Sequence, residues 1–324
     1  MTEEILTNLY RIEVPLPRNP LKALNSYIIK ADGKSLVIDT GMNREECRSV
    51  LSAGLAELEV DLNKADFFIT HLHADHLGLV SAIAADSSKI YFNQPDADII
   101  HNETGAWEEY ASFAVSNGFP EDGVQKAIQS HPGVKYSAQN YRDFHILREG
   151  DVISIGNYSF QCIETPGHTP GHLCLYEPEQ KIFISGDHIL SNITPNISLF
   201  SDDENPLNEY LLSLDKVYNY DVRLVLPGHR AAFTNFRERI EELKHHHEVR
   251  ANEVLAILEK DNSEDAFHVA AQMTWDMSYE SWELFPLMQK WFATGEAIAH
   301  LKYLEEEGKV KREIKGQKVL FSLP

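Results

Sequence analysis

Residues 70–78 read Thr-His-Leu-His-Ala-Asp-His-Leu-Gly and place three histidines and one aspartate within six positions. The apolar run at 65–70 is short enough for a buried strand, so the motif is expected where a strand ends and the chain turns. Gly78 is expected to ease that turn. Imidazole and carboxylate suit zinc, iron and manganese. Because a surface loop has no physical need for imidazoles packed this closely, the stretch predicts a metal site.

Three later loops carry the same kinds of side chain. His168 lies in the stretch Thr-Pro-Gly-His-Thr-Pro-Gly-His at 165–172, Asp187 follows the apolar run at 183–186, and His229 follows the one at 225–228. Each of these side chains is flanked by glycine or proline, as expected of a loop after a strand. Four strand ends that each supply a metal-ligand side chain are stronger evidence for a metal site than any one of these motifs alone.

The order of these side chains resembles the metallo-β-lactamase superfamily over roughly residues 10–235. The resemblance implies an α/β fold, an αββα sandwich with two metal ions at one edge between its sheets. It implies that the first ion is held by His71, His73 and His168, the second by Asp75, His76 and His229, and that Asp187 bridges them. Flavodiiron members carry Glu at the position of His73, so the resemblance favours a hydrolytic site over a redox site.

Further residues near these loops are expected to support the site. In the superfamily, the aspartate at the position of Asp39 braces the metal loops from behind. His172 and His188 each orient a ligand or donate to substrate, or else are hydrogen-bonded within a turn. Two ions are expected to share a hydroxide that acts as the nucleophile, and Asp75 is placed to handle a proton. Zinc is the expected metal, with iron and manganese as alternatives.

Composition and charge limit the class of protein. The chain has 324 residues, 43% of them hydrophobic, which is ordinary for a soluble protein of about two domains. No apolar run reaches the length of a membrane helix, and the acidic N-terminus does not resemble a signal peptide. Three cysteines fit a reducing cytoplasm. A net charge of −21 repels polyanions, so we expect a small-molecule substrate rather than nucleic acid, and the lack of a membrane-length run predicts no membrane partner.

Two domains are expected, a catalytic domain over 1–235 and a C-terminal domain over 236–324. A helical, aromatic-rich insertion at about 95–145 interrupts the first. Its aromatic residues either form a satellite core or cap a substrate pocket, for which Trp107 and Tyr110 are candidates. Helices followed by a hairpin in the second domain resemble a winged helix, with packing on the catalytic domain or a homodimer contact as its expected role.

Periodicity and turn residues predict the individual elements. Strands are expected at 12–17 (an edge strand, because of its prolines), 25–30, 35–40, 65–70, 89–92, 151–155, 158–163, 172–176, 181–185 and 222–226. Helices are expected at 44–58, 77–85, 206–220, 236–260, 263–273, 280–292 and 295–307, and a hairpin at 310–314 and 319–323. Consecutive residues of a helix point in different directions, so His245, His246 and His247 are interpreted as solvated surface.

Three functions remain open. The preferred one is metal-dependent hydrolysis of a small ester or thioester. The first alternative is an endoribonuclease or phosphodiesterase, which an animal mitochondrial enzyme of similar layout favours and the negative charge opposes. The second is a metal-binding regulatory module whose winged helix reads DNA. Residues 295–324 carry six basic and five acidic side chains, a net of +1, which does not favour that reading.

Overall fold

The computed structural model of the chain describes residues 2–324 except 139–140, 142, 200, 262 and 277–278. The chain forms two compact units. Unit 1 consists of Met1–His101, Pro132–Pro195 and Lys216–Arg239, and unit 2 of Asn102–His131, Asn196–Asp215 and Ile240–Pro324. Unit 2 therefore includes most of the predicted insertion as well as the C-terminal region. Residues 139–140 and 142 of that insertion lie outside the described residues.

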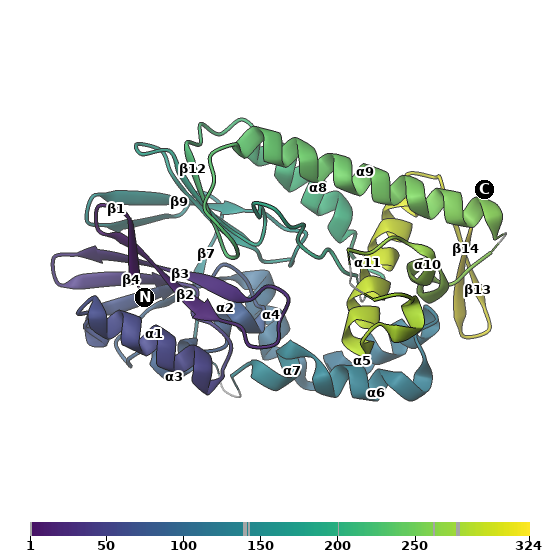
Figure 1. Cartoon of the computed structure of the whole chain (residues 1–324), viewed down its shortest axis with the longest axis horizontal. Helices are drawn as coiled ribbons and strands as arrows, with labels where there is room; N and C mark the ends of the chain where they lie inside the picture. Colours follow the sequence, from purple (N-terminus) through teal and green to yellow (C-terminus); the bar gives the residue numbers. More distant parts are fainter. Residues whose placement is uncertain (1, 139–140, 142, 200, 262, 277–278) are drawn as a thin grey trace. The chain divides into compact units, whose positions relative to one another are not determined.

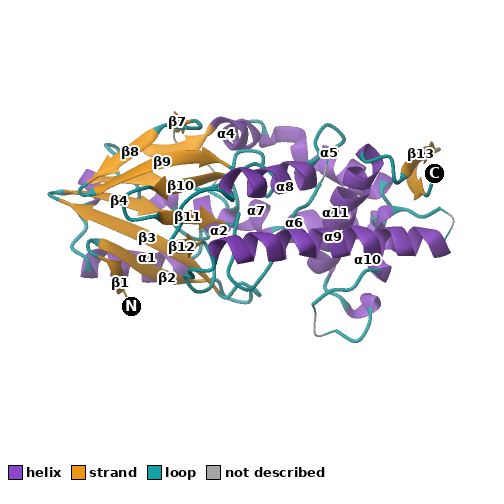
Figure 2. Ribbon diagram, turned by 90° about the horizontal axis from the view of Figure 1, so that it is seen from above, coloured by secondary structure: helices purple, strands orange, loops and turns teal. Residues whose placement is uncertain are grey.

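Unit 1 contains two large sheets, whose strands are orange in Figure 2. The first has seven strands in chain order, antiparallel from β1 to β4 and parallel from β4 to β7. Its strands are β1 Thr2–Leu6, β2 Leu9–Pro15, β3 Ala23–Ala31, β4 Lys34–Ile38, β5 Ala65–Phe68, β6 Ile90–Asn93 and β7 His145–Leu147. The Asp-Gly turn joins β3 to β4 as expected, with Gly33 at a positive φ of 71°.

The second sheet has five strands in the order β12-β11-β10-β9-β8. Its β11–β12 pair is parallel and its other pairs are antiparallel. The strands are β8 Val152–Ile155, β9 Tyr158–Glu164, β10 Leu173–Glu177, β11 Ile182–Gly186 and β12 Leu224–Pro227. It follows from this pairing that β9, β11 and β12 run in one direction, so their carboxyl ends lie at the same edge.

Alternation of apolar side chains along the strands builds two cores in unit 1. Ile29 and Ile38 of the first sheet face Leu175 and Ile184 of the second, and these residues belong to a core between the sheets. On the other face of the first sheet, Val37 belongs to a core that it shares with helix α1 (Glu45–Glu57). On the outer face of the second sheet, the ring of Phe183 lies 5.3 Å from that of Phe236 in α9 (Phe236–Lys260). These layers confirm the predicted αββα sandwich.

Two predictions within the first sheet are wrong. The strand expected at 12–17 is β2, which is not at the edge, because β1 pairs with it on its outer side. The helix expected at 77–85 is replaced by two short helices, α2 Ala74–Leu77 and α3 Val80–Ile83. Gly78 between them has φ −56°, an ordinary helical value, so it does not serve a strained turn. It is needed for space, since an added Cβ would lie 2.7 Å from the Tyr136 carbonyl oxygen.

The remaining helices follow the sequence prediction in most cases (Figure 1). Their bounds are α4 Gln94–His101, α5 Glu103–Ser116, α6 Glu121–Ser130, α7 Pro132–Tyr136, α8 Pro206–Val217, α10 Ala266–Gln272 and α11 Leu287–Glu306, with 3-10 turns at Leu62–Lys64 and Trp282–Leu284. The terminal hairpin is β13 Lys311–Lys315 and β14 Lys318–Ser322. Asn205 caps α8 as expected, accepting a hydrogen bond from the Asn208 amide at 3.2 Å.

Unit 2 has its own core, in which α5 and α6 pack on α11. Buried Phe119 lies with its ring centroid 5.3 Å from that of Trp291, and Ala114 and Ala127 complete the contact. The two helices expected at 280–292 and 295–307 are one helix, α11, which passes through Gly295 without a break. The Gly295 carbonyl accepts a hydrogen bond from the Leu199 amide at 3.1 Å, so a tertiary contact stabilises the helix where its propensity is weakest.

The interpretation of the histidine run in α9 is only partly correct. His245 is exposed, but His247 is only 2% exposed and faces the interior of unit 2. Its Nδ1 lies 3.2 Å from Nε2 of buried His300 on α11.

Among the helices that the structure describes, none combines the length and the apolar character required to cross a membrane.

Candidate metal centre

The ligand side chains predicted from the sequence converge because of strand direction. His71, Asp187 and His229 follow the carboxyl ends of β5, β11 and β12, and His168 follows that of β9. The two sheets are also tied together at this edge. The Leu173 amide donates to the Thr70 carbonyl at 2.8 Å, and the Tyr27 hydroxyl donates to the Pro227 carbonyl at 2.8 Å.

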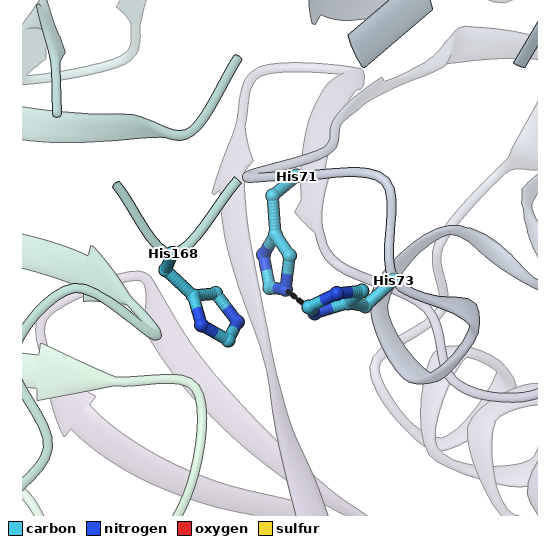
Figure 3. Close-up of side chains that lie close together, drawn as sticks. All are labelled: His71, His73 and His168. Carbon is cyan, nitrogen blue, oxygen red and sulfur yellow. Dashed lines mark hydrogen bonds between the residues drawn. The ribbon is translucent and has the colours of Figure 1, made fainter. Parts of the chain in front are cut away.

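A first group of possible ligands consists of His71, His73 and His168, whose rings point toward one another in Figure 3. Nε2 of His71 lies 3.0 Å from Nδ1 of His73. The ring centroid of His168 lies 4.8 Å from that of His71 and 4.6 Å from that of His73. His71 is fully buried, whereas His73 and His168 are partly exposed, so this group meets solvent on one side.

A second group consists of Asp75, His76 and His229, all buried. Nε2 of His229 lies 3.4 Å from an Asp75 carboxylate oxygen. Asp187 lies between the two groups. Its carboxylate oxygens are 3.5 Å from Nε2 of His76, 3.4 Å from Nε2 of His229 and 3.7 Å from Nε2 of His168. A carboxylate in this position is able to bridge two cations.

The other ring nitrogen of each buried histidine is held by a protein group. Nδ1 of His76 donates to Asp39 at 2.7 Å, Nδ1 of His229 donates to the Ala23 carbonyl at 2.7 Å, and Nδ1 of His71 lies 3.0 Å from the Thr70 hydroxyl. In metal proteins such a contact fixes the tautomer and leaves Nε2 for the ion. Each of the three Nε2 atoms points into the cluster.

Asp39 is the centre of this supporting network. Besides the His76 ring, it accepts hydrogen bonds from the Thr70 amide at 2.8 Å and the Thr70 hydroxyl at 2.9 Å. Its backbone has a positive φ of 58°, which is uncommon for a residue other than glycine and is typical of functional sites. Sequence reasoning included Asp39 but missed Thr70, although this hydroxyl directly precedes the motif.

The two ligand groups differ in how burial and nearby charges shift the pKa values of their side chains. Burial lowers the pKa of His71 well below its ordinary value and that of His73 to about 3, so both rings are neutral and able to bind a cation. Burial also acts to lower the pKa of His229, but Asp187 and Asp75 outweigh it and raise that pKa to about 10. Burial opposes ionisation of Asp75 as well, yet His229 and His76 lower the pKa of this carboxyl to about 2.

His172 supports Asp187 through the backbone. The Asp187 amide donates to Nε2 of His172 at 3.1 Å, and Nδ1 of His172 lies 2.8 Å from the Thr165 hydroxyl. Burial lowers the pKa of His172 well below its ordinary value, which keeps it a neutral acceptor. Its ring centroid lies 6.1 Å from that of His188, which is also fully buried behind the same strand end.

Trp107 and Tyr110, the candidate pocket residues, lie in unit 2. Both pack against the core of α5, α6 and α11, and the Trp107 ring lies 5.6 Å from Tyr110 and 4.8 Å from His131. These contacts give both side chains a structural role. Their role in a substrate pocket stays a prediction.

The residues of unit 1 fit a divalent metal centre. Within the part of the chain that the structure describes, Nε2 of His76, Nε2 of His229 and Oδ1 of Asp187 are buried without a hydrogen-bond partner. Buried polar atoms are normally satisfied, and these three are aimed at the same space. Their imidazole and carboxylate chemistry is that of a site for zinc or a similar ion.

Comparison with known proteins agrees with this geometry. The metallo-beta-lactamase superfamily profile matches residues 21–229, and a profile for the metallo-beta-lactamase-like C-terminal domain matches residues 283–321. The probable metallo-hydrolase YqjP of Bacillus subtilis is 28% identical over 310 residues, covering 91% of this chain and 92% of that protein. An atrochrysone carboxyl ACP thioesterase of Aspergillus fumigatus is 23% identical over 240 residues, covering 74% of this chain and 61% of that protein.

A solved structure has the same fold over the whole chain. A metallo-beta-lactamase family protein of Thermus thermophilus superposes with a TM-score of 0.83 at 28% identity, covering 99% of this chain and all of that one. Fold, profile match and the grouped histidines and aspartates agree with one another. The chain belongs to the metallo-β-lactamase superfamily.

Proposed function

We propose that this protein is a cytoplasmic hydrolase that uses two divalent metal ions, with zinc as the first choice and iron or manganese as alternatives, to cleave a small ester or thioester. The observation that carries the proposal is the meeting of two three-residue groups around one shared carboxylate, that of Asp187. A structural metal site is usually closed and four-coordinate, whereas a pair of groups with a common carboxylate suits catalysis.

Each part of the site has a role in this proposal. Ions bound there would activate water and polarise the scissile carbonyl. His71, His73 and His168 would hold the first ion, Asp75, His76 and His229 the second, and Asp187 both. Asp75 stays ionised at neutral pH, because its pKa is lowered to about 2, and it is our candidate for holding a proton during turnover. Because His73 and His168 are partly exposed, we expect substrate to approach from their side.

Two observations favour an acyl substrate over RNA. Among relatives, one is named a probable metallo-hydrolase and another an ACP thioesterase, whose substrate is an acyl thioester by name. The chain also carries a net charge of −21, which opposes the approach of a polyanion.

The C-terminal region adds to the case against nucleic acid. Four of the six basic side chains at 295–324 are paired with carboxylates: Lys302 with Glu306, Lys309 with Glu307, Arg312 with Asp202 and Lys315 with Glu313. Paired cations have less charge to offer to phosphates. We therefore favour a homodimer contact or internal packing over DNA binding for this winged-helix-like region.

The proposal is tested with protein purified without chelators. Metal content is measured first, with two ions per chain expected. Hydrolysis of p-nitrophenyl esters, acyl thioesters, lactones and single-stranded RNA is then compared between wild type and His73→Ala. We expect ester or thioester hydrolysis to fall about 100-fold or more in His73→Ala, because metal polarisation supplies several kcal/mol of transition-state stabilisation.

The matched control is His245→Ala, which removes an exposed histidine from α9 and should leave activity unchanged. RNA cleavage that His73→Ala abolishes, without acyl hydrolysis above background, would replace the acyl proposal by the phosphodiesterase alternative. A wild-type chain that binds no zinc, iron or manganese would remove both.

A further inference from the structure

A buried carboxylate that belongs to neither ligand group connects two of the ligand loops. Asp96 lies in the first turn of α4, three residues after the end of β6, and is fully buried. Strand β6 runs parallel to β5, so α4 begins at the same sheet edge as the motif at 70–78. Neither the pattern of histidines nor the superfamily resemblance points to this residue.

Asp96 accepts hydrogen bonds from both loops of the first ligand group. The Leu72 amide, between His71 and His73, donates to its Oδ2 at 2.8 Å. From the other loop, the Thr169 hydroxyl donates to Oδ2 at 2.9 Å and the Gly171 amide donates to Oδ1 at 2.7 Å. Thr169 directly follows His168, so a single side chain fixes the backbone beside all three histidines of this group.

The packing around Asp96 leaves no room for adjustment. A Cβ added at Gly171 would lie 2.6 Å from the Asp96 amide nitrogen and 2.8 Å from its carboxyl carbon. In a fully buried position the hydrogen bonds to Asp96 are not exchanged for bonds to water, so a donor that lost Asp96 would be left unsatisfied. The two loops therefore lack an easy alternative arrangement.

Asp39, by contrast, supports both ligand groups, because it accepts from the ring of His76 and from Thr70, which directly precedes His71. The hydrogen bonds to Asp96 come only from residues beside His71, His73 and His168. We propose that Asp96 is a positioning residue that clasps the loops of His71, His73 and His168 and thereby sets the affinity of the first metal ion without touching it. This inference rests on the metal binding of the proposed function.

Replacement of Asp96 by asparagine should break one of the hydrogen bonds that join the two loops, while it preserves the size of the side chain. Asparagine offers one acceptor oxygen and one NH₂ group, whereas three donors converge on Asp96. The Thr169 hydroxyl is able to turn and accept, but one backbone amide is then left facing a donor. Asp98→Asn is the matched control, because Asp98 lies on the same helix and is exposed.

The first measurement uses the metal-free protein. We expect hydrogen exchange at the Leu72 and Gly171 amides to be about 10-fold faster or more in Asp96→Asn than in wild type and Asp98→Asn. The second is a Zn²⁺ titration in competition with a chromophoric chelator, in which His168→Ala and His229→Ala identify the two binding steps. Asp96→Asn should weaken the step that His168→Ala removes by about 10–100-fold and leave the other within a few-fold.

Asp39→Asn should instead weaken both steps, because Asp39 holds the ring of His76 and, through Thr70, the loop of His71. Exchange and both zinc steps of Asp96→Asn at the level of Asp98→Asn would overturn the inference, as would an equal loss in both steps of Asp96→Asn. If Asp96→Asn fails to fold, Thr169→Val decides, with the same selectivity expected at reduced size. Should wild type bind no metal, the proposed function fails, and only a faster exchange in Asp96→Asn would then preserve the clasp.

Discussion

At the scale of single residues, the geometry of the centre depends on contacts behind the ligands. Thr70 contributes one hydroxyl to three groups at once: the carboxylate of Asp39 at 2.9 Å, Nδ1 of His71 at 3.0 Å and Nδ1 of His76 at 3.3 Å. His71 and His76 belong to different ligand groups. A side chain that is never a ligand therefore orients one ligand of each group, and its loss should affect both.

Thr70→Val tests this hub with little change in volume. We expect the zinc affinity of both binding steps to fall by about 10–100-fold, because the tautomer and ring orientation of His71 and His76 lose their common partner. Stability of the metal-free chain should fall by about 1–3 kcal/mol, since Asp39 loses a donor while buried. Chelator competition and urea unfolding measure the two effects. Thr70→Ser keeps the hydroxyl and should restore both the zinc affinity and the stability. A Thr70→Ser variant that binds zinc as weakly as Thr70→Val would show that the hydroxyl does not have this role.

His300 is fully buried in unit 2, and its burial makes the stability of the chain depend on pH. Burial lowers its pKa to about 4, so the unfolded chain takes up a proton near pH 6.5 that the folded chain does not bind. The stability that neutral His300 provides is therefore complete above pH 6.5 and is lost as the pH falls from 6.5 toward 4. One pH unit within that window corresponds to about 1.4 kcal/mol at most.

His300→Gln should flatten this dependence. We expect the variant to be less stable than wild type at pH 7.5, with the difference shrinking at each step toward pH 4.5. Urea unfolding followed by tryptophan fluorescence is a suitable measurement, because all four tryptophans (Trp107, Trp275, Trp282 and Trp291) lie in unit 2. Parallel stability curves for wild type and variant would show that His300 is not neutral in the folded chain.

At the scale of secondary-structure elements, the site depends on the carboxyl ends of parallel strands and on the short helix α2. This helix carries Asp75 and His76 and ends at Gly78. A Cβ added at Gly78 would lie 2.7 Å from the Tyr136 carbonyl oxygen and 2.8 Å from the Asn43 amide nitrogen, two backbone groups that are hydrogen-bonded to each other. Backbone packed this closely against Gly78 leaves α2 without room to shift.

Gly78→Ala should therefore destabilise the chain by about 1–3 kcal/mol through overpacking, and should lower zinc affinity by displacing His76. Urea unfolding and zinc titration test the two parts. Gly123→Ala serves as the control, because Gly123 lies within α6 and its added Cβ would come no closer than 3.3 Å to any neighbour, at the end of the Leu287 side chain. This control should be neutral or more stable by up to about 1 kcal/mol. If Gly78→Ala keeps the stability and zinc affinity of Gly123→Ala, the backbone around Gly78 moves aside at little cost in free energy.

At the scale of the whole molecule, the two units differ in what stabilises them. Unit 1 contains every ligand of the candidate centre, whereas unit 2 has a separate core around Trp291. A ligand that binds only the folded form raises stability by an amount that grows with its concentration over its dissociation constant. Metal should therefore stabilise unit 1 selectively.

Removal of metal should shift only one of two thermal transitions. At a free metal concentration of about 1,000 times the dissociation constant, binding contributes about 4 kcal/mol, which corresponds to roughly 10 °C for a unit of this size. Calorimetry with and without chelator should show this shift. The transition followed by tryptophan fluorescence, which reports on unit 2, should stay in place. Equal shifts by both probes would mean that the units unfold together.

The sequence alone predicted the loops that carry the seven possible ligands, whereas the αββα sandwich and the division of the ligands into two groups were implied by the resemblance to the superfamily. The loops were predicted from local patterns: an apolar run predicts a buried strand, and a polar residue directly after it predicts a side chain at the sheet edge. His71, Asp187 and His229 were found by this rule because strand, turn and ligand lie within a few residues of one another. The hairpin at Asp32-Gly33 and the cap at Asn205 were predictable for the same reason.

Tertiary structure alone decided the features that depend on contacts between distant segments. Strand β1 pairs with β2 on the side that the prolines of β2 had indicated to be a free edge. Helix α11 continues through Gly295, whose carbonyl accepts a hydrogen bond from the Leu199 amide. Burial of His247 depends on His300, 53 positions away. The role inferred for Asp96 depends on donors 24 and 75 positions away, at Leu72 and Gly171. A local pattern identifies a ligand by its type, but only the folded backbone determines which polar groups face each other where water is excluded.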